Sequence, residues 1–385
     1  MPTTEQESPA IDGPKVFWTE EGEAPQSALW HTTNGTPPPQ HITVGNDRLT
    51  ANTAYALARK GKAILWRGDY FNARQLLAAI DRRISRKSPV FSDDPATAFQ
   101  QNRQAQALRS QILGSVLILL SPEGELTLRR APDVREAVVE ACGPYDQSFV
   151  CSLRELLGMI GAHEWRRKGI EISALGAKIH PHYQVFSPMR TEYLDLLTEA
   201  PLPSGDTAFD IGTGTGVLAA ILAKRGMRTI TATDNNPRAL LCAKENIARL
   251  GFSDQVEVLE ADLFPEGRAS LAVCNPPWIP IRASSALESA VYDSEGRMLR
   301  EFLHRLPDHL EPNGEGWLIL SDFAEHIGLR TREELLALFG ESNVDVIDRL
   351  DTKPRHKKAL DQNDALHAAR SAEVTSLWRL KPQTS

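Results

Sequence analysis

The sequence has few cysteines and no long apolar run, and both absences exclude classes of protein. Its 385 residues include four cysteines, Cys142, Cys151, Cys242 and Cys274, without CxxC spacing, so neither a zinc knuckle nor a dithiol redox site is indicated. The apolar stretch over residues 112–120 is too short to cross a bilayer. No basic segment followed by an apolar one opens the sequence. We therefore expect a cytoplasmic protein with no metal and no membrane contact.

Basic residues are scarce in the first 47 residues and abundant just after them. Residues 1–47 contain one basic residue, Lys15, and seven acidic ones, with clustered Pro and Thr, which predicts that much of this segment is a flexible tail. Trp18 and Trp30 argue against disorder throughout it. Residues 48–109 contain twelve Lys or Arg and four Asp. This local excess fits phosphate contacts with RNA, and it fits solvated helix faces equally well. The formal net charge of −7 argues against a wholly basic nucleic-acid binder.

Residues 48–175 are predicted to form a small α+β lobe that recognises the substrate. Apolar residues at helical spacing and strand-like runs alternate along it. The expected helices are 50–59, one starting near Asn72, 134–140 and 153–165, and the expected strands are 63–66, 116–120 and a hairpin partner at 125–129.

A glycine-rich turn, Asp210-Ile211-Gly212-Thr213-Gly214-Thr215-Gly216, separates an expected strand at 207–211 from a helix at 217–225. Its glycines let the chain turn tightly and bring backbone N–H groups and a helix N-terminus against a ligand. A dinucleotide-binding G-x-G-x-x-G would need its third glycine one residue later, where Val217 stands. The spacing therefore disfavours a nicotinamide cofactor.

Two aspartates follow the next expected strands. Asp234 comes eighteen residues after Gly216, where a carboxylate can accept hydrogen bonds from ribose hydroxyls; the alternative is a cap on the helix that starts at Asn235-Asn236-Pro237. Asp262 follows the strand 256–259 and can accept an adenine amino group, with the next residues flanking the ring. Its alternative is an ordinary loop aspartate.

Asn275-Pro276-Pro277-Trp278 closes the apolar run 271–274 and is the most specific motif of the chain. The lone pair of an amide or exocyclic amine is delocalised, so a site must hold the N–H groups and aim that lone pair. The Asn275 side-chain oxygen and the Pro276 carbonyl can each accept one N–H. Trp278 supplies a flat face for stacking. The motif predicts methyl transfer to a planar nitrogen.

Together, the glycine turn, Asp234, Asp262 and NPPW resemble class I S-adenosylmethionine-dependent methyltransferases, in the small-domain group with release-factor glutamine and ribosomal RNA N-methyltransferases. The resemblance covers roughly residues 180–385 and implies a methyltransferase domain over 176–385. It implies a Rossmann-like α/β fold: a seven-stranded sheet with helices on both faces and a reversed last strand, its final pair at 344–350 and 373–380. It also implies that S-adenosylmethionine is the cofactor, that Asp210 organises its amino-acid end and that Asn275 holds the substrate nitrogen.

The segment Val185 to Tyr193 resembles the one that closes over the donor in glutamine methyltransferases, with two departures. Pro188-Met189-Arg190-Thr191-Glu192 replaces their Pro-Arg-Pro-Glu-Thr, and Trp278 replaces their Tyr. The acceptor therefore stays open between RNA and a translation-associated protein. The alternatives are a methyltransferase of a small metabolite and a donor-binding scaffold without turnover. The sequence does not give the oligomeric state.

The candidate site residues follow from these motifs. The catalytic candidates are Asn275, Pro276 and Trp278. The candidates for donor binding are Asp210, Gly212, Thr213, Gly214, Gly216, Asp234, Asn235, Asp262, Leu263 and Asn275. The candidates for the substrate pocket are Phe186, Arg190 and Pro277; Phe186 could equally belong to the core, and Arg190 to the surface.

Overall fold

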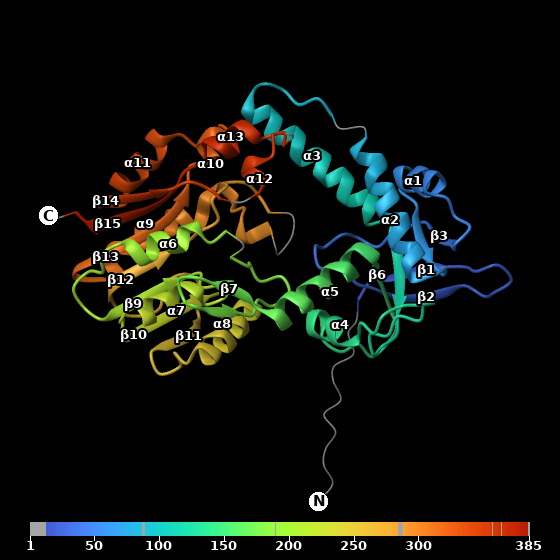
Figure 1. Cartoon of the computed structure of the whole chain (residues 1–385), viewed down its shortest axis with the longest axis horizontal. Helices are drawn as coiled ribbons and strands as arrows, with labels where there is room; N and C mark the ends of the chain where they lie inside the picture. Colours follow the sequence, from blue (N-terminus) through green and yellow to red (C-terminus); the bar gives the residue numbers. More distant parts are fainter. Residues whose placement is uncertain are drawn as a thin grey trace, which may run out of the picture. The chain divides into compact units, whose positions relative to one another are not determined.

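The computed structural model describes residues 13–86, 89–188, 190–283, 288–355, 357–362 and 364–383. They form two compact units (Figure 1). The N-terminal unit comprises residues up to 90 together with 103–164, and the C-terminal unit comprises 91–102 together with the residues from 165 onward. The helices α3 (Pro95–Leu113) and α5 (Leu153–Lys168) contain two of the points where the chain passes between units. None of the helices in the described ranges is long and apolar enough to cross a membrane.

The N-terminal unit is built on a six-stranded sheet in the order β1-β2-β6-β5-β4-β3. Its strands are β1 (Lys15–Trp18), β2 (Gln26–Trp30), β3 (Ile42–Gly45), β4 (Ala63–Trp66), β5 (Val116–Leu120) and β6 (Phe149–Ser152). The helices α1 (Ala51–Arg59), α2 (Tyr70–Ser85) and α4 (Arg135–Cys142) belong to it with parts of α3 and α5. All four residues of β4 are buried, so this strand is central to the core.

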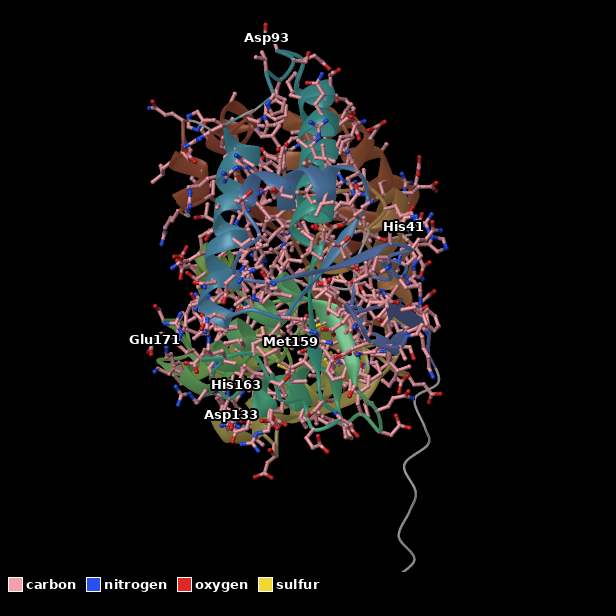
Figure 2. All side chains as sticks on the ribbon, turned by 90° about the vertical axis from the view of Figure 1, so that its right-hand side faces the viewer. His41, Asp93, Asp133, Met159, His163 and Glu171 are labelled. Atoms are coloured by element: carbon pink, nitrogen blue, oxygen red, sulfur yellow. The ribbon has the colours of Figure 1, made fainter. Side chains whose placement is uncertain are left out.

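Figure 2 shows the side chains of α5, where Met159 and His163 lie one helical turn apart. Met159 is 1% exposed and belongs to the core. The Nδ1 atom of His163 lies 2.5 Å from Oε2 of Glu140 on α4. One helix face thus provides both an apolar and a polar contact within the unit.

Two expectations for this region differ from the structure. The flexible tail expected over 1–47 contains β1, β2 and β3, in which Val16 and Leu29 are buried; residues 1–12 lie outside the described part. The expected strand at 125–129 does not form. Residues 122–124 do turn, with a positive φ at Gly124. Beyond the turn, the backbone of Arg129 forms an isolated β-bridge with Asp69 in place of a strand.

Smaller differences concern where elements begin. The helix expected near Asn72 is α2, which begins at Tyr70 because Asp69 is its N-cap and accepts the Phe71 N–H at 2.9 Å. We expected the second unit to begin near residue 176, whereas the chain enters it after 164, and the earlier segment 91–102 also belongs to it.

The C-terminal unit contains the expected seven-stranded sheet, in the order β11-β10-β9-β12-β13-β15-β14. Its strands are β9 (Thr207–Ile211), β10 (Thr229–Asp234), β11 (Val256–Glu260), β12 (Ala269–Cys274), β13 (Leu310–Ser321), β14 (Val344–Thr352) and β15 (Thr375–Pro382). Strands β9 to β13 are parallel, and β15 runs antiparallel to both β13 and β14. The reversed last strand and the final pair are as predicted.

Helices cover both faces of this sheet (Figure 1). One face packs against α6 (Glu192–Glu199), α7 (Val217–Lys224) and α8 (Pro237–Leu250), and the other against α9 (Arg297–His309) and α11 (Arg332–Glu341). Alternate strand residues serve the two cores: Trp317 faces the first and Leu318 the second. Shorter elements are β7 (Ile170–Ile172), β8 (Ala177–Ile179), η1 (Glu288–Ala290), η2 (Ser294–Gly296), α10 (Phe323–His326), α12 (Lys357–Leu360) and α13 (His367–Ala372).

The strand order reverses at β9, and this places the site. From β9 the sheet extends through β10 and β11 on one side and through β12 and β13 on the other. Ligands of parallel sheets bind beyond the carboxyl ends of the strands at such a switch point. Ile211 pairs with Cys274 in register, so the glycine turn after β9 and the NPPW motif after β12 leave the sheet side by side.

Candidate active site

The glycine turn adopts a backbone that larger residues avoid. Gly212, Gly214 and Gly216 have φ values of 73°, 55° and 80°. A Cβ on Gly212 would lie 2.5 Å from the Met298 methyl carbon, whereas a Cβ on Gly214 would meet nothing within 4 Å. The positive φ therefore accounts for Gly212, because the Met298 methyl group ends a flexible side chain that can move away, and Gly214 faces open space along the wall of the cavity.

Asp210 is completely buried and supports the turn from behind. Its Oδ2 accepts hydrogen bonds from the Thr213 hydroxyl at 2.6 Å and from the Ala219 N–H, in the first turn of α7, at 3.0 Å. Burial raises the pKa of Asp210 to about 6, against the lowering effect of these two hydrogen bonds. Its Oδ1 has no partner among the described residues. The carboxyl therefore fixes the shape of the turn.

Asp234 lies at the end of β10 with its carboxylate held by backbone groups. Oδ2 accepts the Gly214 N–H at 3.0 Å and Oδ1 accepts the Asn236 N–H at 2.9 Å. The N-cap of α8 is Asn236. Burial raises the pKa of Asp234. Asp234 and Asn235 both line the cavity, so the carboxylate faces the space beside Gly214.

Asp262 and Leu263 form the next part of the wall. The Asp262 carboxylate is 61% exposed and makes an ion pair with Arg297 at 3.2 Å. Leu263 is buried with a φ of 75°, and its carbonyl accepts the Thr233 hydroxyl at 2.5 Å. A ligand amino group at Asp262 would share this carboxylate with Arg297.

The NPPW motif forms the opposite wall. Trp278 donates its indole N–H to Oδ1 of Asn275 at 2.9 Å. The Arg190 guanidinium lies over the Trp278 ring, 4.9 Å from its centroid, and the buried Tyr193 ring meets the indole edge to face, with centroids 6.4 Å apart. Trp278 is therefore oriented by three neighbours.

These walls enclose a cavity of about 330 Å³, within the range typical of small-molecule sites. Two expected site residues, Asp210 and Gly216, do not line it. The expected residues that do are Phe186, Arg190, Gly212, Thr213, Gly214, Asp234, Asn235, Asp262, Leu263, Asn275, Pro276, Pro277 and Trp278. Tyr193, the last residue of the segment expected over the donor, lines it as well. Lining residues that the sequence did not reveal include Val291, Arg297 and Met298.

The cavity fits a nucleoside-containing cation. Its glycine turn leaves room beside Gly214, and the Asp234 carboxylate is fixed by backbone N–H groups at the edge of that room. The Asp262 carboxylate on the next strand end adds a further hydrogen-bond acceptor to the lining. A sulfonium donor would find hydrogen-bond acceptors and no uncompensated positive charge among the lining residues named above.

The raised pKa of Asp210 predicts a pH-dependent stability. Because the folded protein binds this proton more tightly than the unfolded chain, the stabilisation is complete below about pH 4 and is lost as the pH rises through about 6. Asp210→Asn lacks this titration. From pH 4.5 to 7.5, wild type should lose about 2 kcal/mol relative to the variant, or several degrees in melting temperature.

Melting curves of the two proteins at both pH values, without donor, measure this difference. Groups that do not interact with Asp210 titrate alike in both proteins, so their contributions cancel in the comparison. Parallel pH profiles for wild type and Asp210→Asn would show that the carboxyl titrates normally.

Comparison with known proteins identifies the family. Residues 177–347 match the model of the family described as "Methyltransferase small domain". A protein of Methanocaldococcus jannaschii named "Putative protein N5-glutamine methyltransferase" is 32% identical over 153 residues, covering 38% of this chain and 75% of that protein. The release factor glutamine methyltransferase of Cereibacter sphaeroides is 33% identical over 164 residues, covering 39% and 57%.

Two further matches are named for the ribosomal protein L11. The ribosomal protein L11 methyltransferase of Vibrio vulnificus is 34% identical over 96 residues, 25% of this chain and 32% of that protein. The crystal structure of the L11 methylase from Lactobacillus delbrueckii subsp. bulgaricus has a TM-score of 0.34 and 18% identity, covering 49% of this chain and 76% of that one. The sheet and the cavity are of the expected type, and the chain covers 75% of a relative to which it is 32% identical. This chain therefore belongs to the small-domain family of S-adenosylmethionine-dependent class I methyltransferases.

Proposed function

We propose that the protein methylates a side-chain amide nitrogen of a translation-associated protein, with S-adenosylmethionine as the donor. The observation that carries the proposal is the position of Asn275. The preceding residue, Cys274, pairs with Ile211 at the end of β9, and Asn275 lines the same cavity as the glycine turn. The names of the relatives, glutamine and ribosomal protein methyltransferases, favour a protein acceptor.

In this proposal the donor lies along the glycine turn. The Asp234 carboxylate accepts hydrogen bonds from its ribose hydroxyls, and Asp262 accepts one from the adenine amino group, with Leu263 against the ring. Asn235 and Thr213 complete the wall, and Asp210 keeps the turn in shape through Thr213 and α7.

Asn275 orients the acceptor. An amide oxygen has two lone pairs, and one of those on Oδ1 accepts the Trp278 N–H. The other accepts one N–H of the acceptor, and the Pro276 carbonyl accepts the second. The nitrogen lone pair then points at the methyl group. Holding two reacting groups in this way can lower a barrier by about 7–11 kcal/mol in favourable cases.

The step is an in-line displacement. The acceptor nitrogen forms a bond to the methyl carbon while the carbon–sulfur bond breaks, and its electron pair stays on sulfur, which becomes a neutral thioether. The nitrogen becomes acidic as the new bond forms, and its proton leaves to water. No strong general base is needed.

Methyl transfer into a lysate that lacks this protein tests the proposal. Tritiated methyl from S-adenosylmethionine should enter a protein fraction on addition of wild type and should be absent with Asn275→Ala. Loss of label on protease treatment, with resistance to nuclease, supports the proposal, and mass spectrometry should place the extra 14 Da on Gln or Asn, the mass that one methyl group adds.

The other outcomes reject the proposed acceptor. Label that nuclease removes would identify RNA and make the basic segment 48–109 its expected contact. Label confined to small molecules would identify a metabolite methyltransferase. No label that depends on Asn275 would favour a scaffold without turnover.

A further inference from the structure

Two buried carboxylates hold Arg190 at the edge of the cavity. Its Nε donates to Oε1 of Glu192 at 2.9 Å, and its Nη1 donates to Oε1 of Glu373 at 2.9 Å. Glu192 is 3% exposed and Glu373 is 1% exposed. Ion pairs that are buried in this way are screened only weakly by dissolved salt. The planar guanidinium is therefore held from two sides in one orientation.

The anchors come from distant parts of the C-terminal unit. Glu192 is the first residue of α6, and Glu373 lies two residues before the first residue of β15. The Ser321 hydroxyl, at the end of β13, donates to the same Oε1 of Glu373 at 2.5 Å. The arginine is thus fixed relative to the central sheet.

The cluster is not arranged to bind an anion. Two carboxylates face one guanidinium, so Arg190 has no uncompensated positive charge to offer a phosphate or a carboxylate. The second oxygen of Glu373, Oε2, is buried and accepts no hydrogen bond from any described residue. A buried oxygen without a partner lowers stability, so stability alone does not account for Glu373.

What the cluster does contact is Trp278. The guanidinium covers the indole ring at 4.9 Å, and the indole N–H reaches Oδ1 of Asn275 at 2.9 Å. An indole nitrogen only donates. It therefore selects the rotamer of Asn275 that places the oxygen, and not the NH₂ group, at this position.

The orientation of this amide matters for the reaction. A flipped Asn275 would present its own NH₂ group to the N–H groups of the acceptor, donor against donor. Phenylalanine at position 278 could not select the rotamer at all. A tyrosine hydroxyl both donates and accepts, so it would select less strictly.

We propose that Glu192 and Glu373 are positioning residues for methyl transfer: through Arg190 they hold Trp278, and Trp278 holds the Asn275 amide with its oxygen toward the acceptor. This inference rests on the proposed role of Asn275. Neither carboxylate touches the reacting atoms.

The Trp278 indole N–H is itself the reporter for the test. Protein labelled with ¹⁵N-tryptophan contains seven tryptophans, and Trp278→Phe identifies the resonance of Trp278 by its loss. In Glu373→Gln and in Arg190→Lys we expect that resonance to shift and its exchange with water to accelerate at least about 10-fold. Arg190→Lys keeps the charge but loses the planar fork, and it serves alone if Glu373→Gln does not fold.

Glu315→Gln is the matched control. Glu315 is also a buried carboxylate of this sheet: it pairs with Arg379 at 2.9 Å and accepts the Trp317 indole N–H at 3.2 Å. It does not line the cavity. This variant should shift the Trp317 resonance and leave that of Trp278 in place.

Activity completes the test. With the labelling assay above, Glu373→Gln should lower the initial rate about 10-fold, with the dissociation constant for S-adenosylmethionine within about twofold of wild type, and Glu315→Gln should not lower it. An unmoved Trp278 resonance in Glu373→Gln and Arg190→Lys overturns the proposal, as does a moved resonance with a wild-type rate. Full activity of Asn275→Ala instead overturns the proposed function and leaves the spectroscopic result standing.

Discussion

Replacing Asn275 with alanine should lower the turnover number about 100-fold or more and change the dissociation constant for S-adenosylmethionine less than about threefold. The side chain supplies the oxygen that accepts an acceptor N–H, and alanine leaves that group without a partner and the nitrogen lone pair unaligned. The ligands proposed for the ribose and adenine, Asp234 and Asp262, stay in place. Initial rates of methyl transfer and calorimetric titration of the donor measure the two effects.

Asn275→Asp is the matched comparison. It keeps an oxygen that can accept both the Trp278 N–H and an acceptor N–H, so it should retain more turnover than alanine. A wild-type rate for Asn275→Ala would show that the side chain does not orient the nitrogen. Equal losses in rate and in donor affinity would assign Asn275 to the donor.

Much of the catalytic site could be predicted because its signals are local. A positive φ that only glycine adopts readily explains Gly212, Gly214 and Gly216, and prolines mark the NPPW turn. Residues 208–211 of the strand before the turn are all buried, as is typical of a central strand in a parallel sheet. These features depend on neighbours in sequence.

The partners of those residues could not be predicted, because they come from distant segments. Met298 lies against Gly212, and Arg297 pairs with Asp262, only because the fold brings the first residues of α9 to the loops that follow β9 and β11. Glu373 reaches Arg190 across 183 residues. No pattern of residue types near any of these side chains in the sequence indicates the contact.

Composition misled the interpretation of the N-terminal region. Low basic content and clustered Pro and Thr favoured a flexible tail over 1–47, yet β1 and β2 bury Val16, Trp18 and Leu29. Strands of four and five residues contribute too few apolar positions to outweigh the acidic residues between them. These strands are stabilised by pairing: β1 pairs with β2, and β2 pairs with β6, which lies more than a hundred residues later.

Replacing Asp234 with alanine should weaken binding of S-adenosylmethionine by about 2–3 kcal/mol, or about 30- to 150-fold in dissociation constant. The proposed carboxylate–ribose hydrogen bonds are charged, and they form in a site partly shielded from water, where burial already raises the pKa of this group. The carboxylate also holds the Gly214 N–H at 3.0 Å, so its loss loosens the turn on which the donor lies. Isothermal titration calorimetry measures the affinity directly.

Glu260→Ala distinguishes the loss of a specific hydrogen bond to the donor from the loss of one negative charge. Glu260 is the register partner of Asp234 on β11 and does not line the cavity, so its removal changes the charge at the same edge of the sheet without touching the proposed ribose site. We expect its donor affinity to stay within about twofold of wild type, because Glu260 is exposed to solvent, where a single charge contributes little, and makes no proposed contact with the donor. If Asp234→Ala keeps the wild-type affinity for the donor, as Glu260→Ala should, the ribose assignment is wrong. If both lose affinity equally, the negative charge of the edge attracts the cationic donor, and no single hydrogen bond determines its affinity.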